Sequence, residues 1–354
     1  MPTDPSSSPD SRPVAPLLVD VLRGPFAESG HRGHAVVIDA DGGLLAHWGE
    51  PDLSVMPRSA IKSLQALALV ESGAVEAFGL SAADIALACA SHGGEDKHAR
   101  RAIDWLGRIG LTVADLECGA QPPMHRDSAD ALVAAGTSPT AAHNNCSGKH
   151  VGFLTTAVHL GIDHRGYTRH DHPIQALVRR HMQAMTDIDP DGRPWGIDGC
   201  SIPAHALPLR NIALALARLD AHGADDTTAH GRACRRIVEA WGAHPDLVAG
   251  TGRFDTRLMT AAQGRALTKA GAEGVSCAIV PGRRIAVAVK IEDGAERAAS
   301  VVMAAILSAL GAVDRNDPEI RSLAAPTLSN WNGISVGGLT PTAEFAESLK
   351  AAFS

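Results

Sequence analysis

The order of strand-like and helix-like segments is the feature of this 354-residue chain that most limits its fold. Apolar segments at 35–38 and 44–48 flank a glycine-containing turn, which predicts a β-hairpin. A second hairpin is predicted at 275–280 and 285–291, followed by a helix over 295–310. The pattern lacks the regular alternation of strands and helices that is typical of a doubly wound fold. It favours an α+β fold with an antiparallel sheet built from both ends of the chain.

The long middle of the chain shows apolar residues three and four apart, which predicts helices. The predicted helices cover 59–72, 81–90, 97–109, 128–135, 150–160, 173–186, 209–220 and 228–243. The chain is long enough for one large domain or two ordinary ones. We expect a disordered tail over residues 1–16, which are rich in Pro and Ser, and one domain over 17–354 with room for two lobes.

Composition excludes several classes of function. The net charge is −7 and aromatic residues make up 3% of the chain, so neither a basic stripe nor a set of stacking platforms for nucleic acid is present. No apolar run reaches about 18 residues, and the first residues contain no hydrophobic stretch of the signal-peptide type. We therefore expect a cytoplasmic protein that contacts neither nucleic acid nor membrane.

The six cysteines include no CxxC pair, which predicts that they are reduced rather than part of a disulfide framework. Cys89 and Cys277 lie within apolar runs, where a free cysteine is typically a small core residue. Cys146 and Cys200 instead lie among Asn, Gly, Asp and Ser. These two cysteines are the ones that could carry chemistry.

Lysine is scarce, with 6 residues against 26 arginines, yet Lys62, Lys149 and Lys269 all lie among glycine and other small residues. Arginine does not lose its proton near neutral pH, whereas a desolvated lysine can. A chain that otherwise favours arginine has reason to keep lysine where a base or a neutral ligand is needed.

Ser59 and Lys62 are three residues apart, which on a helix places the amine on the same face as the hydroxyl. A desolvated amine there can accept the serine proton as the serine attacks a carbonyl. The spacing alone is not specific, and a solvent-facing lysine in a first helical turn remains an alternative. The segment 91–95, Ser-His-Gly-Gly-Glu, is a second polar cluster directly after an apolar run, although a glycine-rich turn explains it equally.

Cys146, Lys149 and Cys200 could bind a soft divalent ion such as zinc, because thiolates prefer it and a neutral amine offers a nitrogen ligand. Lysine is rarely a zinc ligand, so a reactive or structural Cys146 beside a solvated Lys149 remains an alternative. A phosphate loop is excluded, because no glycine stands at position 143 and His150 replaces the Ser/Thr of that motif.

The segment 269–271, Lys-Ala-Gly, precedes the second hairpin and is similar to the Lys-Thr-Gly element of serine penicillin-recognising enzymes, which lies on an edge strand. The Ser-Asp-Asn element of those enzymes is missing from this chain. That absence argues against a β-lactamase or transpeptidase.

Six motifs in order make a combination that resembles the Rhizobium etli type L-asparaginases, also called the asparaginase II family or class 3 asparaginases. The resemblance extends from about Val19 to Gly338. It implies a fold like that of serine β-lactamases and glutaminases, a homodimer, and L-asparagine as the small-molecule substrate. The motifs are Arg58-Ser59-Ala60-Ile61-Lys62, residues 91–95, Asn145-Cys146-Ser147-Gly148-Lys149-His150, Gly196-Ile197-Asp198-Gly199-Cys200-Ser201, residues 250–256 and residues 269–274.

Carried over by position, the resemblance implies that Ser59 is the nucleophile and Lys62 its base. Ser91 and Lys269 form an implied second Ser-Lys pair that relays protons or assists the attack. The resemblance also implies a zinc ion (Zn2+) and residues that bind substrate or orient the site. The implied zinc ligands are Cys146, Lys149 and Cys200, and the implied substrate-binding residues are Arg58, His150 and Asp198.

The expected reaction is acyl transfer from the side-chain carboxamide of L-asparagine to Ser59, followed by hydrolysis to L-aspartate. Two alternatives stay open on the sequence. One is another Ser-Lys amidase or a β-lactamase-like hydrolase. The other is a non-catalytic, zinc-containing protein that binds amino acids.

Overall fold

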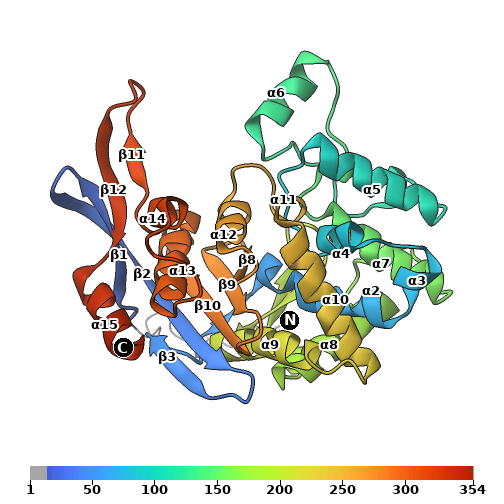
Figure 1. The fold of residues 1–354 in the computed structure, drawn as a ribbon. Helices are drawn as coiled ribbons and strands as arrows, with labels where there is room; N and C mark the ends of the chain where they lie inside the picture. Colours follow the sequence, from blue (N-terminus) through green and yellow to red (C-terminus); the bar gives the residue numbers. More distant parts are fainter. Residues whose placement is uncertain (1–13, 354) are drawn as a thin grey trace, which may run out of the picture.

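The computed structural model describes residues 14–353, and its largest element is an antiparallel sheet of eight strands (Figure 1). The strand order is β11-β12-β1-β2-β10-β9-β8, with β3 also paired to β2. Strands from both ends of the chain lie side by side in it, which confirms the predicted α+β arrangement. The strands are β1 (Leu17–Arg23), β2 (Phe26–Asp39), β3 (Leu44–Trp48), β8 (Leu267–Ala270), β9 (Val275–Val280), β10 (Ile285–Ile291), β11 (Thr327–Ser329) and β12 (Ser335–Pro341).

Strand β2 is the longest strand and holds the sheet together. Its first half pairs with β1, and its second half lies between β10 and β3. The pairing with β1 shifts register at two places and the pairing with β3 at one. Such irregularities increase local twist, and the sheet curls along β2 (Figure 1).

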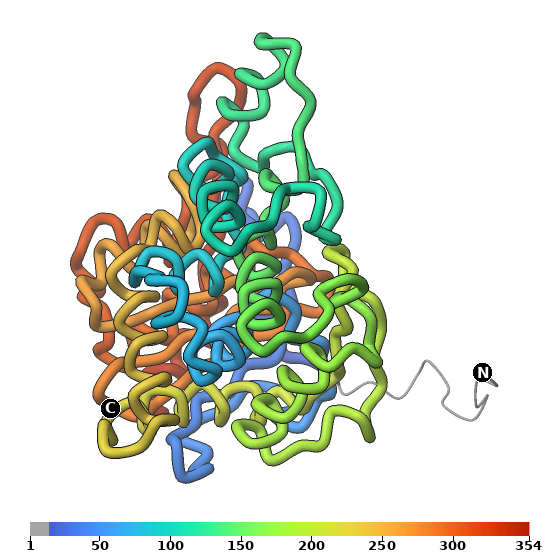
Figure 2. The backbone as a smooth tube through the Cα atoms, turned by 90° about the vertical axis from the view of Figure 1, so that its right-hand side faces the viewer, coloured from blue at the N-terminus to red at the C-terminus, as the bar shows by residue number. Residues whose placement is uncertain are grey.

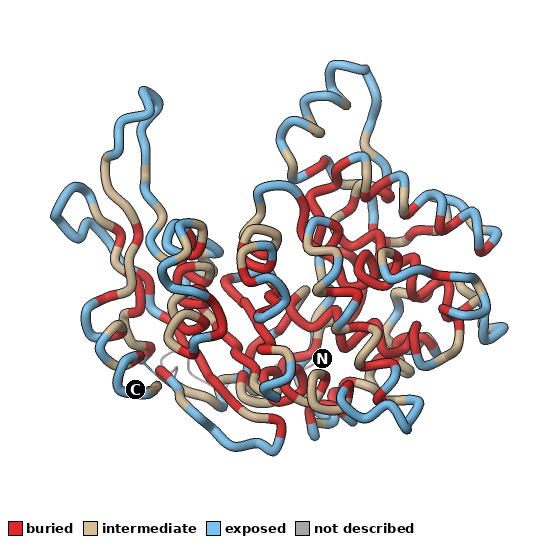
Figure 3. The backbone as a smooth tube through the Cα atoms, in the orientation of Figure 1, coloured by how far each residue is buried: buried red, intermediate tan, exposed pale blue. Residues whose placement is uncertain are grey.

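Alternation of side chains along the strands divides the interior into two cores. On β2, Val36 and Ile38 belong to one core, whereas Ala35 and Val37 belong to the other. Successive side chains of a strand point to opposite faces of the sheet. When both faces are covered, the sequence of each central strand is therefore a continuous run of apolar residues. Helix α9 (Leu209–Gly223) packs on the first face and α13 (Glu296–Ala309) on the second. Figure 3 shows the central strands as buried between these layers.

The predicted helices other than 59–72 are present with ends shifted by about three residues at most, and α8, β3, β9 and β10 have the predicted bounds. The helices within 74–77, 245–262, 318–324 and 343–353 were not predicted. No helix among residues 14–353 is long and apolar enough to cross a membrane. In both views, α6 and the β11–β12 hairpin project from the same end of the molecule (Figure 2). The other helices are α3 (Ala74–Ala77), α4 (Ala82–Ala88), α5 (Asp96–Arg108), α6 (Arg126–Ala134), α7 (Ser147–His159), α8 (Pro173–Thr186), α10 (Ala229–Ala243), α11 (Pro245–Val248), α12 (Phe254–Ala262), α14 (Pro318–Ala324) and α15 (Ala343–Phe353).

The single helix predicted over 59–72 is wrong in detail, because the segment is broken into three. A 3-10 turn, η2 (Arg58–Ile61), is followed by α1 (Lys62–Gln65) and α2 (Leu67–Glu71). In a 3-10 turn, side chains three residues apart eclipse one another. The predicted proximity of positions 59 and 62 therefore does not require a regular α-helix.

The start of the described chain is joined to β2. The carbonyl of Ala15 accepts a hydrogen bond from Arg32 Nη1 (2.8 Å), and that of Pro16 accepts one from the Gly33 amide (3.1 Å). Residues 1–13 of the predicted disordered tail lie outside the described residues. All six cysteines are free and buried, as predicted for Cys89 and Cys277.

Helices α4 and α7 approach closely because glycine stands at position 148. A Cβ atom there would lie 2.2 Å from the carbonyl oxygen of Leu87, and one at Gly152 would lie 3.6 Å from Ala88 Cβ. The first distance is too short for any side chain, so the two backbones would have to separate. This contact places the start of α7 beside the segment that follows α4.

We expect Gly148→Ala to lower the free energy of unfolding by about 1–3 kcal/mol, as overpacking does in other interiors. The measurement is urea-induced unfolding of both proteins. The matched control is Gly107→Ala in α5, where a Cβ meets nothing within 4 Å. That change should raise stability by about 0.5–1 kcal/mol, because alanine is the better helix former. Wild-type stability in Gly148→Ala would contradict the packing argument.

Candidate active site

Motif segments that are far apart in sequence meet around residues 91–95. The His92 amide donates to the Asn145 carbonyl (3.1 Å), and the His92 ring bonds the Ser147 hydroxyl through Nε2 (2.9 Å). The Glu95 carboxylate accepts hydrogen bonds from the amide (2.8 Å) and the hydroxyl (2.6 Å) of Thr251. Residues 91–95 therefore connect the motif at 145–150 to the motif at 250–256.

Lys62 is almost completely buried, with 1% of its surface exposed. Its Nζ donates to the Ala90 carbonyl (2.5 Å), to Ser91 Oγ (2.9 Å) and to Cys146 Sγ (3.0 Å). Burial lowers the pKa of this amine below its usual value, and the nearby Cys146 opposes the shift. The alternative of a solvated lysine at this position is thereby excluded.

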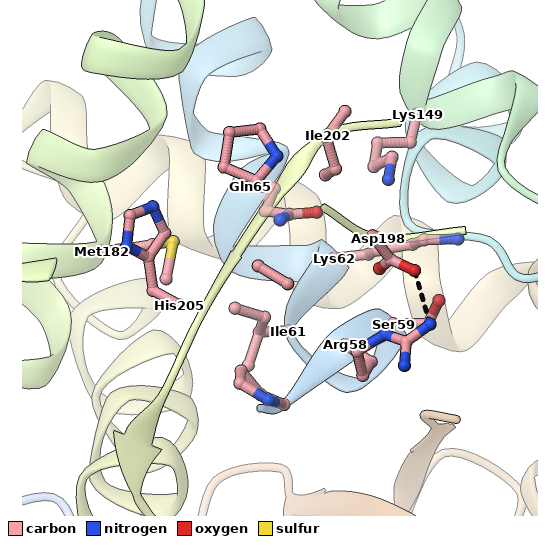
Figure 4. Close-up of a pocket in the computed structure, with 13 residues that line it drawn as sticks. Arg58, Ser59, Ile61, Lys62, Gln65, Lys149, Met182, Asp198, Ile202 and His205 are labelled. Carbon is pink, nitrogen blue, oxygen red and sulfur yellow. Dashed lines mark hydrogen bonds and ion pairs between the residues drawn. The ribbon is translucent and has the colours of Figure 1, made fainter. Parts of the chain in front are cut away.

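Ser59 lies half-buried in the 3-10 turn η2, and no residue among 14–353 forms a hydrogen bond with its Oγ. The preceding residue, Arg58, has a left-handed backbone with φ of 51°. A residue other than glycine in that region costs about 1–3 kcal/mol and persists only where its surroundings hold it, often at functional sites. Figure 4 shows Ser59 and Lys62 among the residues lining one narrow pocket.

A second pocket of about 160 Å³ also borders Ser59. Pockets for drug-sized ligands occupy about 300–1,000 Å³, so this one suits a small solute. Its lining is mostly polar. The lining residues are Arg58, Ser59, Gln121, Asn144, Asn145, Cys146, Asp198, Gly199, Cys200 and Ala272.

Arg58 and Asp198 form an ion pair in the wall of both pockets, with 2.6 Å between Nη2 and Oδ1 (Figure 4). Burial disfavours the charged form of Asp198. The hydrogen bond from Arg58 and the charge of Lys149 outweigh that effect and hold the pKa of the carboxyl below its usual value. Both side chains are thus charged where they border the pocket.

The three predicted metal ligands lie together in the interior. Lys149 Nζ donates to Cys200 Sγ (3.0 Å). The neighbouring Cys200 thiol, together with the charges of Lys149 and Lys62, holds the pKa of Cys146 well below its usual value despite burial. Burial lowers the pKa of Lys149, but the two sulfur atoms more than compensate and raise it. Two thiols of the type that zinc accepts therefore converge with one amine.

Lys269 lies on the edge strand β8, as predicted for the Lys-Ala-Gly segment. It is 1% exposed, and burial lowers the pKa of its amine to about 7. Its Nζ donates to the Ala270 carbonyl (2.7 Å). Among residues 14–353, Ser91 bonds Lys62 rather than Lys269. The predicted second Ser-Lys pair is thus not hydrogen-bonded here.

Glycine at position 271 lets strand β8 approach η2. A Cβ there would lie 2.8 Å from the Pro57 carbonyl and 3.3 Å from the Ala60 amide nitrogen. The strand is held from the other side by Asp255, whose Oδ2 accepts a hydrogen bond from the Ala270 amide (2.9 Å). The end of β8 therefore lies directly against the backbone that carries Ser59.

His150 is fully buried, and its Nδ1 bonds the hydroxyl of Tyr167 (2.7 Å). Burial, strengthened by the charge of Lys149, moves the pKa of His150 well below its usual value. His150 borders neither of the two pockets that Ser59 lines, whereas Arg58 and Asp198 border both.

Sequence reasoning gave no role to several residues that shape this site. Asn144 accepts a hydrogen bond from the Cys146 amide through Oδ1 (2.9 Å) and donates to the Cys118 carbonyl (2.9 Å). Thr251 and Asp255 belong to a motif that carried the resemblance, so their positions were marked without a function. Gln121, which lines the larger pocket, follows no pattern in the sequence.

Comparison with known proteins identifies the family of this chain. No curated protein matches the chain significantly. The sequence profile described as L-asparaginase II matches residues 19–341, which include every motif described above. The chain therefore belongs to the L-asparaginase II family, and this membership makes it an asparaginase.

Proposed function

We propose that this protein hydrolyses L-asparagine to L-aspartate and ammonia, with Ser59 as the nucleophile. The observation that carries the proposal is the setting of Ser59. Its hydroxyl has no hydrogen-bond partner among residues 14–353, it borders a polar pocket of about 160 Å³, and it stands one 3-10 turn from the buried amine of Lys62. Ser91 is the weaker candidate for nucleophile, because it is 8% exposed and borders neither pocket.

The proposed reaction proceeds in two halves. Ser59 Oγ bonds to the side-chain carbonyl carbon while its proton passes to the Lys62 amine. The carbon–nitrogen bond then breaks, and ammonia leaves with that proton. Water attacks the aspartyl ester in the same manner and releases aspartate and the Ser59 hydroxyl. Ser91, at 2.9 Å from Lys62, is placed to pass a proton to or from this amine.

The Arg58–Asp198 pair suits the remaining part of the substrate. Free asparagine carries an α-carboxylate and an α-ammonium group, and the pair presents one guanidinium and one carboxylate to the pocket. A guanidinium binds a carboxylate through parallel hydrogen bonds. We assign the α-carboxylate to Arg58 rather than to His150, because His150 borders neither pocket.

We further propose that Cys146, Lys149 and Cys200 hold zinc. The set fits the ion, because its three donors are buried together and one thiol already favours the thiolate form. The Lys149 amine would give up its proton on binding the metal. The ion would supply positive charge that helps to hold and orient the substrate. Asp198 lies close enough to Lys149 for the charge of that amine to lower the pKa of the carboxyl, and the carboxylate could bond water at this site.

Three finer assignments rest on the sequence resemblance and stay proposals. They are the Rhizobium etli type, the serine β-lactamase-like fold and assembly as a homodimer. A cytoplasmic location rests on the composition of the sequence and is likewise a proposal.

Ammonia release from L-asparagine and, in parallel, from L-glutamine tests the proposed function. We expect release from asparagine in large excess over glutamine, since the small pocket leaves little room for a longer side chain. Ser59→Ala should lower kcat at least about 10³-fold, because no other group replaces the nucleophile. The matched control is Ser63→Ala, since the buried Ser63 hydroxyl has no hydrogen-bond partner among the described residues.

Wild-type turnover in Ser59→Ala would disprove the role of Ser59. Cleavage of another amide with no release from asparagine would instead point to a different Ser-Lys amidase. Calorimetric binding of asparagine without release would support the amino-acid-binding alternative.

The pKa of about 7 at Lys269 predicts a pH dependence. Below that pH the amine is protonated and cannot accept a proton, so kcat should rise with pH through about 7 if Lys269 assists as a base. Lys269→Met should lower kcat and remove this rise, as measured in a pH–rate profile. The control is Lys350→Arg on the surface helix α15. An unchanged midpoint in Lys269→Met would assign the rise to another group.

Metal analysis of the purified protein tests the zinc proposal. Cys200→Ala should hold one equivalent of zinc less than the wild type, because a three-ligand site loses a thiolate. Cys89→Ala, which removes a buried cysteine outside the ligand set, should keep the wild-type content. Equal metal content in Cys200→Ala and wild type would refute this site.

A further inference from the structure

A second group of metal-binding side chains lies on the neighbouring helices α9 and α10, outside the site described above. His222 stands near the end of α9, and His230 and Cys234 lie one turn apart on α10. His230 Nε2 is 2.9 Å from His222 Nδ1 and 3.5 Å from Cys234 Sγ. All three ligand atoms lie within 4.8 Å of one another. Two nitrogens and one sulfur thus face a common point.

Glu71, the last residue of α2, determines which nitrogen of His230 presents its lone pair to the cluster. Its Oε1 lies 2.6 Å from His230 Nδ1. An ionised carboxylate only accepts hydrogen bonds, so Nδ1 carries a proton. In the neutral ring, Nε2 is then unprotonated and directed at His222 and Cys234. Metal-binding histidines typically donate their other N–H to a carboxylate in this manner.

We propose that His222, His230 and Cys234 form a second binding site for a soft divalent transition-metal ion of the zinc class. In a tetrahedral zinc site, nitrogen ligands lie about 3.3 Å apart and a nitrogen and a sulfur about 3.6 Å apart, as follows from the usual bond lengths. The observed 2.9 and 3.5 Å differ little from these values. His230 is 34% exposed, so solvent can supply a fourth ligand.

The site would act as a clamp between helices rather than in the reaction. It joins α9 to α10, and Glu71 connects both to the end of α2. None of the residues in it borders either pocket next to Ser59. Bound metal should therefore raise the thermal unfolding temperature while leaving kcat for asparagine unchanged.

Equilibrium dialysis of the full-length protein against dilute Zn2+, followed by metal analysis, tests the site. Cys234→Ser should bind one equivalent less than the wild type and keep wild-type kcat. His222→Gln provides a second variant should Cys234→Ser fold poorly, and it should show the same loss. Glu71→Gln should weaken binding about 10–100-fold, as removal of such carboxylates does at other sites. The matched control is His159→Gln, a histidine outside the cluster, with wild-type binding.

Co2+ in place of Zn2+ adds a spectroscopic readout, because a cysteine ligand produces a thiolate-to-cobalt charge-transfer band. Part of that band should vanish in Cys234→Ser and the rest in Cys200→Ala. Loss of metal in Cys200→Ala alone would overturn this proposal and leave the zinc site at Cys146, Lys149 and Cys200 standing. Loss of metal in Cys234→Ser alone would support this proposal and contradict the zinc site at Cys146, Lys149 and Cys200. Wild-type Zn2+ binding in both Cys234→Ser and His222→Gln would also overturn it.

Discussion

The buried amine of Lys62 is the interaction on which the rest of the site depends. A polar group removed from water is costly unless it is hydrogen-bonded. Lys62 meets this demand with partners from two other segments, Ala90 with Ser91 and Cys146. Those segments must stay in place for the amine to stay buried. The same contacts that make Lys62 chemically useful thus fix the relative positions of η2, the end of α4 and the start of α7.

Close backbone approach is the second requirement of this arrangement. The start of α7 reaches α4 through Gly148, and β8 reaches η2 through Gly271. Both glycines belong to motifs that also contain candidate catalytic or metal-binding lysines. The glycines bring the backbones together, and the neighbouring lysines are buried. This division explains why lysine and small residues occur together in the sequence.

Periodicity predicted the elements whose own residues decide their structure. Strands β9 and β10 are predominantly apolar and are separated by a tight turn, so their bounds could be read directly from the sequence. Strand β12 contains two glycines and gains its structure from pairing with β1, a long-range contact that no local pattern reveals. The break after η2 was missed for the same reason, since contacts with β8 hold that turn. The order of the motifs grouped most site residues. It did not predict that Ser91 is a hydrogen-bond partner of Lys62.

The division of the interior by the sheet separates two properties of the molecule. Cys146, Cys200 and the neighbours of Ser59 belong to the core on the α9 face, whereas the core on the α13 face contains none of the candidate catalytic residues. Packing on the α13 face can therefore drift during evolution and adjust the lifetime of the fold without touching the chemistry. Homologous sequences adapted to different temperatures would then differ most in that layer, and least in the one that holds the lysines.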